Sequence, residues 1–164
     1  MAAVKTMDDL FLYMLKDVYY AEKLILRSMP KMIKQTQTPE LKQAFEKHRE
    51  ETEGQVERLE KVFEECEAPA RAVRCEAMDG IIAEAKEMME EVEDGHVRDA
   101  AILAAAQSVE HYEISRYGTL IAWAQQLGMK NAVKLLQQTL EEEKKTDKLL
   151  SELALRSVNQ SAAE

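Results

Sequence analysis

Four long helical segments of this sequence each place one acidic residue at mid-length on the stripe that should be apolar. These residues are Glu22, Glu51, Glu110 and Glu143. Removing an unpaired carboxylate from water costs several kcal/mol or shifts its pKa, so such residues are rarely buried without a partner. Four carboxylates at one level of a bundle would repel each other strongly in a low dielectric. A multivalent cation removes that repulsion, and facing glutamates in a four-helix bundle are how di-iron and di-manganese sites are built.

The helical stripes follow steps of three and four residues through each segment. The first runs from Phe11 to Met29 through Glu22, and the second from Leu41 to Val62 through His48, Glu51 and Gln55. The third runs from Leu103 to Ala124 through Glu110, Glu113 and Tyr117, and the fourth from Ala132 to Leu150 through Thr139, Glu143 and Asp147. Each stripe is therefore apolar at both ends and polar in the middle.

Capping and breaking residues give the boundaries of the elements. Thr6 precedes two acids and starts a helix, and Thr38-Pro39-Glu40 starts the next one. Asp79-Gly80 is expected to open a short amphipathic helix. Gly128 is expected to adopt a left-handed conformation and to end the long helix 96–127. We predict one domain, 1–164, with helices at about 6–36, 39–66, 79–91, 96–127 and 131–156 and a polar, frayed tail at 157–164.

The lengths of the connections predict the topology. Short turns join the first two long helices and the last two, so each pair forms an antiparallel hairpin. The connection 67–95 is long enough to run from one end of the bundle to the other. The fold class predicted is all-α: a ferritin-like antiparallel four-helix bundle of two hairpins and a long crossover, with an extra short helix.

Seven side chains are candidate metal ligands: Glu22, His48, Glu51, Glu110, Glu113, Glu143 and Asp147. The usual Glu-x-x-His pattern is absent, because Gly54 and Thr146 stand three residues after Glu51 and Glu143. His48, Glu113 and Asp147 are each one turn from a central glutamate and could complete the set. A ligand set rich in oxygen suits iron or manganese better than copper or zinc.

Composition narrows the function classes. The net charge of −9 argues against nucleic-acid binding through phosphate contacts. No run approaches the roughly 18 apolar residues of a membrane span, and the amino terminus does not look like a secretion signal, so we expect a cytoplasmic protein. Cys66 and Cys75 are expected to be free thiols.

Several segments closely resemble the bacterial YciF-like stress-protein family over about residues 6–158. They are Ala21-Glu22-Lys23, 48–52, 75–78, 109–114, 117–120 and 140–147. The resemblance implies a ferritin-like bundle with an extra short helix, a homodimer and a rubrerythrin-like di-metal centre. It supplies no reaction.

Two functions follow as hypotheses. The first is a stress-related protein with two Fe ions (Mn as the alternative) and iron-oxidising or peroxide-consuming activity, with O2 or peroxide as the small-molecule partner. The second is a structural or interaction dimer whose metal only stabilises the bundle. A nucleoid-compacting shell is disfavoured by the acidic charge.

Overall fold

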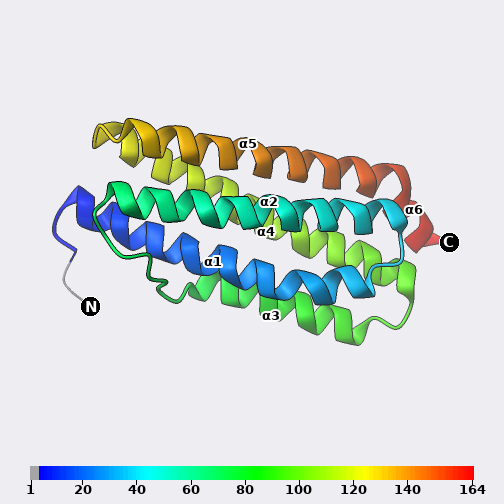
Figure 1. The fold of residues 1–164 in the computed structure, drawn as a ribbon. Coiled ribbons are helices and arrows are strands. Elements are labelled where there is room, and N and C mark those ends of the chain that lie inside the picture. The colour runs from blue at the N-terminus through cyan, green and yellow to red at the C-terminus, as the bar shows by residue number, and fades with distance from the viewer. Residues whose placement is uncertain (1–3) are drawn as a thin grey trace.

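A computed structural model describes residues 4–164, and its long helices form an antiparallel bundle (Figure 1). Four helices make the bundle: α1 (Met7–Gln35), α2 (Pro39–Glu65), α4 (Gly95–Gln126) and α5 (Lys130–Leu153). The short α3 (Glu76–Glu91) lies in the crossover, and the chain ends in a π-helical turn (Ala154–Val158) and α6 (Asn159–Ala163). The predicted ferritin-like arrangement of two hairpins and a long crossover is confirmed.

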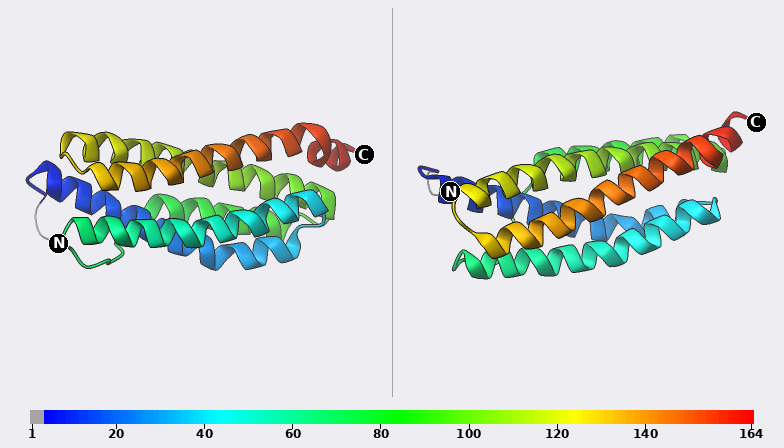
Figure 2. Two further views of the ribbon diagram at one scale, coloured as in Figure 1. Left: turned by 45° about the horizontal axis from the view of Figure 1, so that its top comes forward. Right: turned by 90° about the horizontal axis from the view of Figure 1, so that it is seen from above.

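Each long helix packs on two neighbours around the bundle. The neighbouring pairs are α1 with α2, α2 with α5, α5 with α4, and α4 with α1, and the views in Figure 2 show α5 beside both α4 and α2. The crossover leaves the end of α2, and α3 then runs along the outside of α1 and α4. No helix in the described part of the chain is long and apolar enough to cross a membrane.

The helix starts follow the capping signals of the sequence, with one correction. Thr6 and Asp9 form the capping box of α1, with 3.0 Å bonds in both directions, and Pro39 opens α2. However, α3 begins at Glu76 instead of 79, because the Cys75 thiol caps it by accepting a bond from the Met78 N–H. Asp79 lies within the first turn, where it accepts bonds from Tyr20 and Arg74.

The carboxyl-terminal segment also differs from the prediction. The expected frayed tail 157–164 is helical up to Ala163, and Val158 is buried against the cluster that includes Leu41, Ile102 and Leu153. Burial of Val158 holds this segment on the bundle, since removing a valine side chain from water is worth about 1.5–3 kcal/mol.

The apolar core is divided into layers along the bundle. One cluster, which includes Phe11, Leu59, Tyr117 and Leu136, fills the end of the bundle where α1 starts. A second cluster, which includes Met32, Leu41, Ile102 and Leu150, fills the other end. A layer of buried polar side chains lies between them, and this layer is the candidate site.

Candidate metal centre

The centre of the bundle contains four buried glutamates and one buried histidine. The carboxylates of Glu110, Glu113 and Glu143 and the imidazole of His48 each offer an atom within 4.8 Å of the others. Glu22 is also fully buried, and its carboxylate acts on Glu113, whose pKa it raises. All four long helices therefore supply this centre: α1 Glu22, α2 His48, α4 Glu110 and Glu113, and α5 Glu143.

The helical stripes explain why these side chains meet. Each acid lies three or four residues from an apolar contact on its own helix, as Glu22 does between Val18 and Ile25. On α4, two acids one turn apart face the same interior, and Tyr117 follows one turn later. The apolar side chains above and below exclude water from the centre, which strengthens every electrostatic interaction inside it.

Several carboxylate oxygens in the centre are buried without a hydrogen-bond partner. They are Oε2 of Glu22, Glu110 and Glu143 and both oxygens of Glu113. Buried polar atoms are normally paired, so a group of orphaned oxygens at one point requires an explanation. A bound cation is the explanation that fits carboxylates, because it satisfies their lone pairs and their charge together.

Burial sets the protonation of these groups. Desolvation raises the pKa of Glu22, Glu110 and Glu113 well above the ordinary value, and the neighbouring carboxylates raise it further. Desolvation also raises the pKa of Glu143, to about 7, although the nearby Glu110 carboxyl and the Gln55 amide, which donates to Glu143, oppose it. Without a cation, the centre therefore retains protons at neutral pH.

His48 is neutral in the same conditions, because burial lowers its pKa to about 4. Its Nε2 lies 3.2 Å from Glu110 Oε1, which would make an ion pair only if the ring were charged. We take the contact as one between neutral groups, since the pKa of Glu110 is raised and that of His48 is lowered. The neutral imidazole is the form that binds metals.

Two of the predicted ligands lie at the edge of the centre. The side chains of Glu51 and Asp147 are 23% and 24% exposed, and neither belongs to the group around His48. Glu51 pairs with Lys47 at 3.2 Å, and Asp147 Oδ1 lies 3.0 Å from Nε2 of the exposed His111. Thr52 and Thr146 point inward in their place, and the Thr146 hydroxyl lies 3.5 Å from His48 Nδ1.

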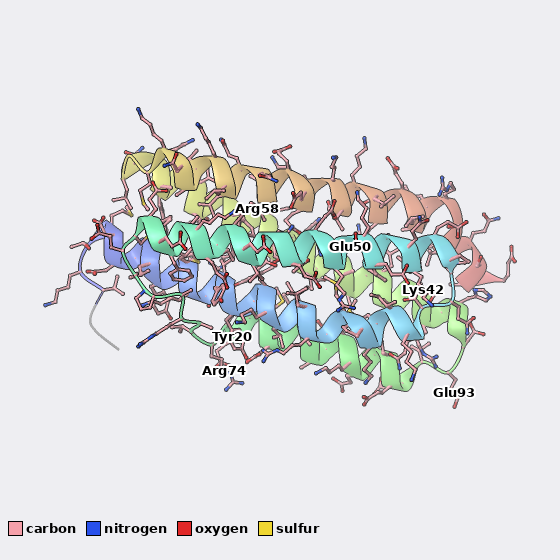
Figure 3. The ribbon with its side chains drawn as sticks, viewed as in Figure 1. Tyr20, Lys42, Glu50, Arg58, Arg74 and Glu93 are labelled. Carbon is pink, nitrogen blue, oxygen red and sulfur yellow. The ribbon has the colours of Figure 1, made fainter. Side chains whose placement is uncertain are left out.

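Three polar residues that were not predicted as ligands hold the acids in position. Fully buried Gln55 donates its amide N–H to Glu143 and, at 3.2 Å, to Glu142. Arg58, on the side of α2 that faces α5 (Figure 3), binds Glu142 and Thr139. Tyr117 donates its hydroxyl to Glu22. The sequence carried a signal for two of these residues, because Gln55 and Tyr117 each lie on the same helical stripe as a central acid.

These features define a helical bundle with a buried carboxylate–histidine centre that could hold a metal. Comparison with known proteins gives the family. The chain matches DUF892, described as a domain of unknown function, over residues 6–163, and it belongs to this family.

The relatives agree with the fold. Protein YciF of Escherichia coli (strain K12) is 49% identical over 160 residues, which cover 97% of this chain and 96% of YciF. The crystal structure of the E. coli stress protein YciF superposes with a TM-score of 0.90 at 50% identity, covering 95% of this chain and 99% of that one. This chain is thus a homologue of a stress protein.

Two further structures show the same bundle. YcfI from Rhodopseudomonas palustris, described as a candidate structural protein, has a TM-score of 0.90 at 48% identity and covers 92% of this chain and 96% of its own. A Xanthomonas campestris protein has a TM-score of 0.70 at 22% identity over 90% of each chain, and shows the fold alone.

Proposed function

We propose that the protein holds a dinuclear metal centre, with iron as the first candidate and manganese as the second, and acts in a cytoplasmic stress response. The observation that carries this proposal is the set of orphaned carboxylate oxygens beside His48 at the middle of the bundle. Glu22, Glu110, Glu113 and Glu143 would hold the ions together with His48. Hard oxygen donors with a single imidazole suit Fe and Mn.

Bound iron would supply redox chemistry towards dioxygen or peroxide, which is the basis of the proposed iron-oxidising or peroxide-consuming activity. The chain's own contribution is to bring carboxylates from three helices together in the buried interior and to present a neutral imidazole. Glu51 and Asp147 are partly exposed at the edge of the centre, and we propose that they act as outer carboxylates. Their charges reach the centre, since Glu51 raises the pKa of Glu143 and Asp147 raises that of Glu110.

The stoichiometry of iron binding tests this proposal. After anaerobic loading with ferrous iron and removal of free metal, elemental analysis should approach two irons per chain. Exposure to oxygen should then change the absorption spectrum of the protein. A stoichiometry well under one iron per chain, with no spectral change, would contradict the dinuclear centre.

A structural role for the metal is the second candidate function. The R. palustris relative is described as a candidate structural protein, and the absence of Glu-x-x-His leaves only one imidazole at the centre. In that case the cation would neutralise the acids and fix the bundle without turnover. Comparing O2 or peroxide consumption by the loaded protein with that by free iron separates the two functions, because a structural metal would give no acceleration.

We also propose that the protein is a homodimer, as the family resemblance implies. The structure leaves little apolar surface on α3 for this purpose: Ile82, Ala85 and Met89 are buried, while Ile81 and Met88 are partly exposed. Light scattering at micromolar concentration should report twice the chain mass of 18.7 kDa. A monomer under these conditions would rule the dimer out.

A further inference from the structure

A small apolar cavity adjoins the candidate metal centre on the side of α3. Its volume is about 20 Å³, and His48 and Glu110 form part of its wall. The other lining residues come from α1, α2, α3 and α4 and include Ile25, Ser28, Met32, Ile82, Ala106 and Val109. A cavity needs about 10–15 Å³ on this measure to admit one water molecule, so there is room for one very small molecule.

The wall of the cavity offers almost nothing to a polar ligand. Ser28 is the only other polar residue, and its hydroxyl already donates to the Leu24 carbonyl oxygen at 2.9 Å. His48 Nε2 and Glu110 Oε1 contact each other at 3.2 Å, and the other oxygen of Glu110, Oε2, is one of the unpaired oxygens assigned above to the metal centre. A water or peroxide molecule placed here would lose hydrogen bonds that these atoms do not replace, whereas apolar cavities stay dry and take up xenon or small apolar molecules.

A surface groove between α1 and α3 leads toward the same place. The groove has a volume of about 250 Å³ and shares Ser28, Met32 and Ile82 with the cavity. Arg27, Lys31 and Lys86 contribute to it, and Lys31 pairs with Glu90 at 3.2 Å. Positive charge at this opening disfavours the approach of metal cations. The partly exposed acids Glu51 and Asp147 are not part of this opening, since they belong to α2 and α5.

We propose that this cavity binds a small uncharged apolar molecule and that dioxygen is the ligand it suits, in preference to peroxide. The groove between α1 and α3 is its path from solvent. The cavity itself does not depend on a metal, but its use for chemistry rests on the proposed function. Of the two oxidants that the sequence left open, the apolar wall selects dioxygen.

Xenon is the probe, applied to the metal-free full chain. Methyl resonances of Ile25, Ile82 and Val109 should shift with xenon pressure and approach saturation. Ala106→Leu should abolish these shifts, because the larger side chain fills the cavity from α4. Val109→Ile, a smaller change, should weaken them if Ala106→Leu does not fold. Ala104→Leu, at an exposed position of α4, should leave them unchanged.

Dissolved oxygen and peroxide then identify the natural ligand. Paramagnetic dioxygen should enhance relaxation of the same methyl groups in the wild type and in Ala104→Leu and should not do so in Ala106→Leu. Hydrogen peroxide should not compete with xenon. Absence of a saturable xenon shift, equal shifts in all variants, or displacement of xenon by peroxide would overturn the proposal. A protein that binds xenon and no metal would instead overturn the proposed function and leave the cavity standing.

Discussion

Glu143→Ala is expected to lower the affinity for ferrous or manganous ions by more than about 100-fold, beyond the 10–100-fold typical of losing a residue that only supports a ligand. Glu143 is fully buried, one of its oxygens has no partner, and it is the only acid that α5 supplies to the group around His48. Removing Glu143 therefore leaves the α5 side of the centre without a carboxylate ligand for the metal. Titration with Mn²⁺ measures the affinity, and circular dichroism checks the fold.

The neighbouring residues supply matched comparisons on the same helix. Glu141→Ala should change the affinity by less than about twofold, because Glu141 is exposed and surface substitutions rarely matter by more than about 0.5 kcal/mol. Asp147→Ala should weaken binding less than Glu143→Ala does. Gln55→Leu should cost about 10–100-fold, since the Gln55 amide N–H donates to Glu143 and holds it in position. If Glu141→Ala were the damaging change, the proposed centre would be wrong.

Metal-free protein is expected to lose stability as the pH rises from about 6 to 9. Over the same range, the stability of the metal-loaded protein should increase relative to that of the metal-free protein. In the folded chain the pKa values of Glu22, Glu110 and Glu113 are raised well above the ordinary value, and that of Glu143 is raised to about 7. The folded state then holds protons that the unfolded state releases, so this stability is complete below about pH 4.5 and is lost as the pH rises through the folded pKa values.

His48 acts in the opposite direction at lower pH. Its pKa is lowered to about 4, so its contribution is lost as the pH falls from about 6.5 toward 4. The metal-free protein should therefore be most stable at mildly acidic pH. Metal binding requires ionised carboxylates, and its affinity should increase as the pH rises.

Thermal melts at pH 6, 7.5 and 9, with and without a chelator, measure both effects. A cation at 100 times its Kd stabilises the native state by about 2.7 kcal/mol, which corresponds to roughly 5–11 °C in Tm for a chain of this size. The difference in Tm between the melts with and without chelator should increase with pH. The Glu141→Ala variant should show the same difference as the wild type. Equal melting temperatures with and without chelator at all three pH values would contradict a stabilising metal.

Local sequence rules determined most of the fold. Thr6 and the Thr38-Pro39 pair gave the starts of the first two long helices, and Gly128 adopts the left-handed conformation expected of it, with φ of +73°. The lengths of the connections then required two hairpins and a crossover. These features could be predicted because a helix cap or a turn depends on residues only a few positions apart.

The site shows where local rules stop. A step of either three or four residues keeps a side chain on one helical face, so the sequence could not choose between Glu51 and Thr52 after His48, nor between Thr146 and Asp147 after Glu143. The bundle turns both threonines inward and leaves both acids partly exposed. The threonine hydroxyls can be satisfied inside, as Thr52 donates to the His48 carbonyl oxygen, whereas two more carboxylates would add buried charge.

The sequence by itself determined that the first, third and fourth long helices would place acids at mid-bundle, because the periodicity that forms a helix also fixes which residues share its face. Only the tertiary structure decided which acids meet, which polar side chains hold them, and that an apolar cavity lies beside them. Those outcomes depend on contacts between residues far apart in the chain, such as Gln55 with Glu143 and Tyr117 with Glu22. No periodic pattern within one helix specifies the rotation of its neighbour, and that rotation decides what each buried acid touches.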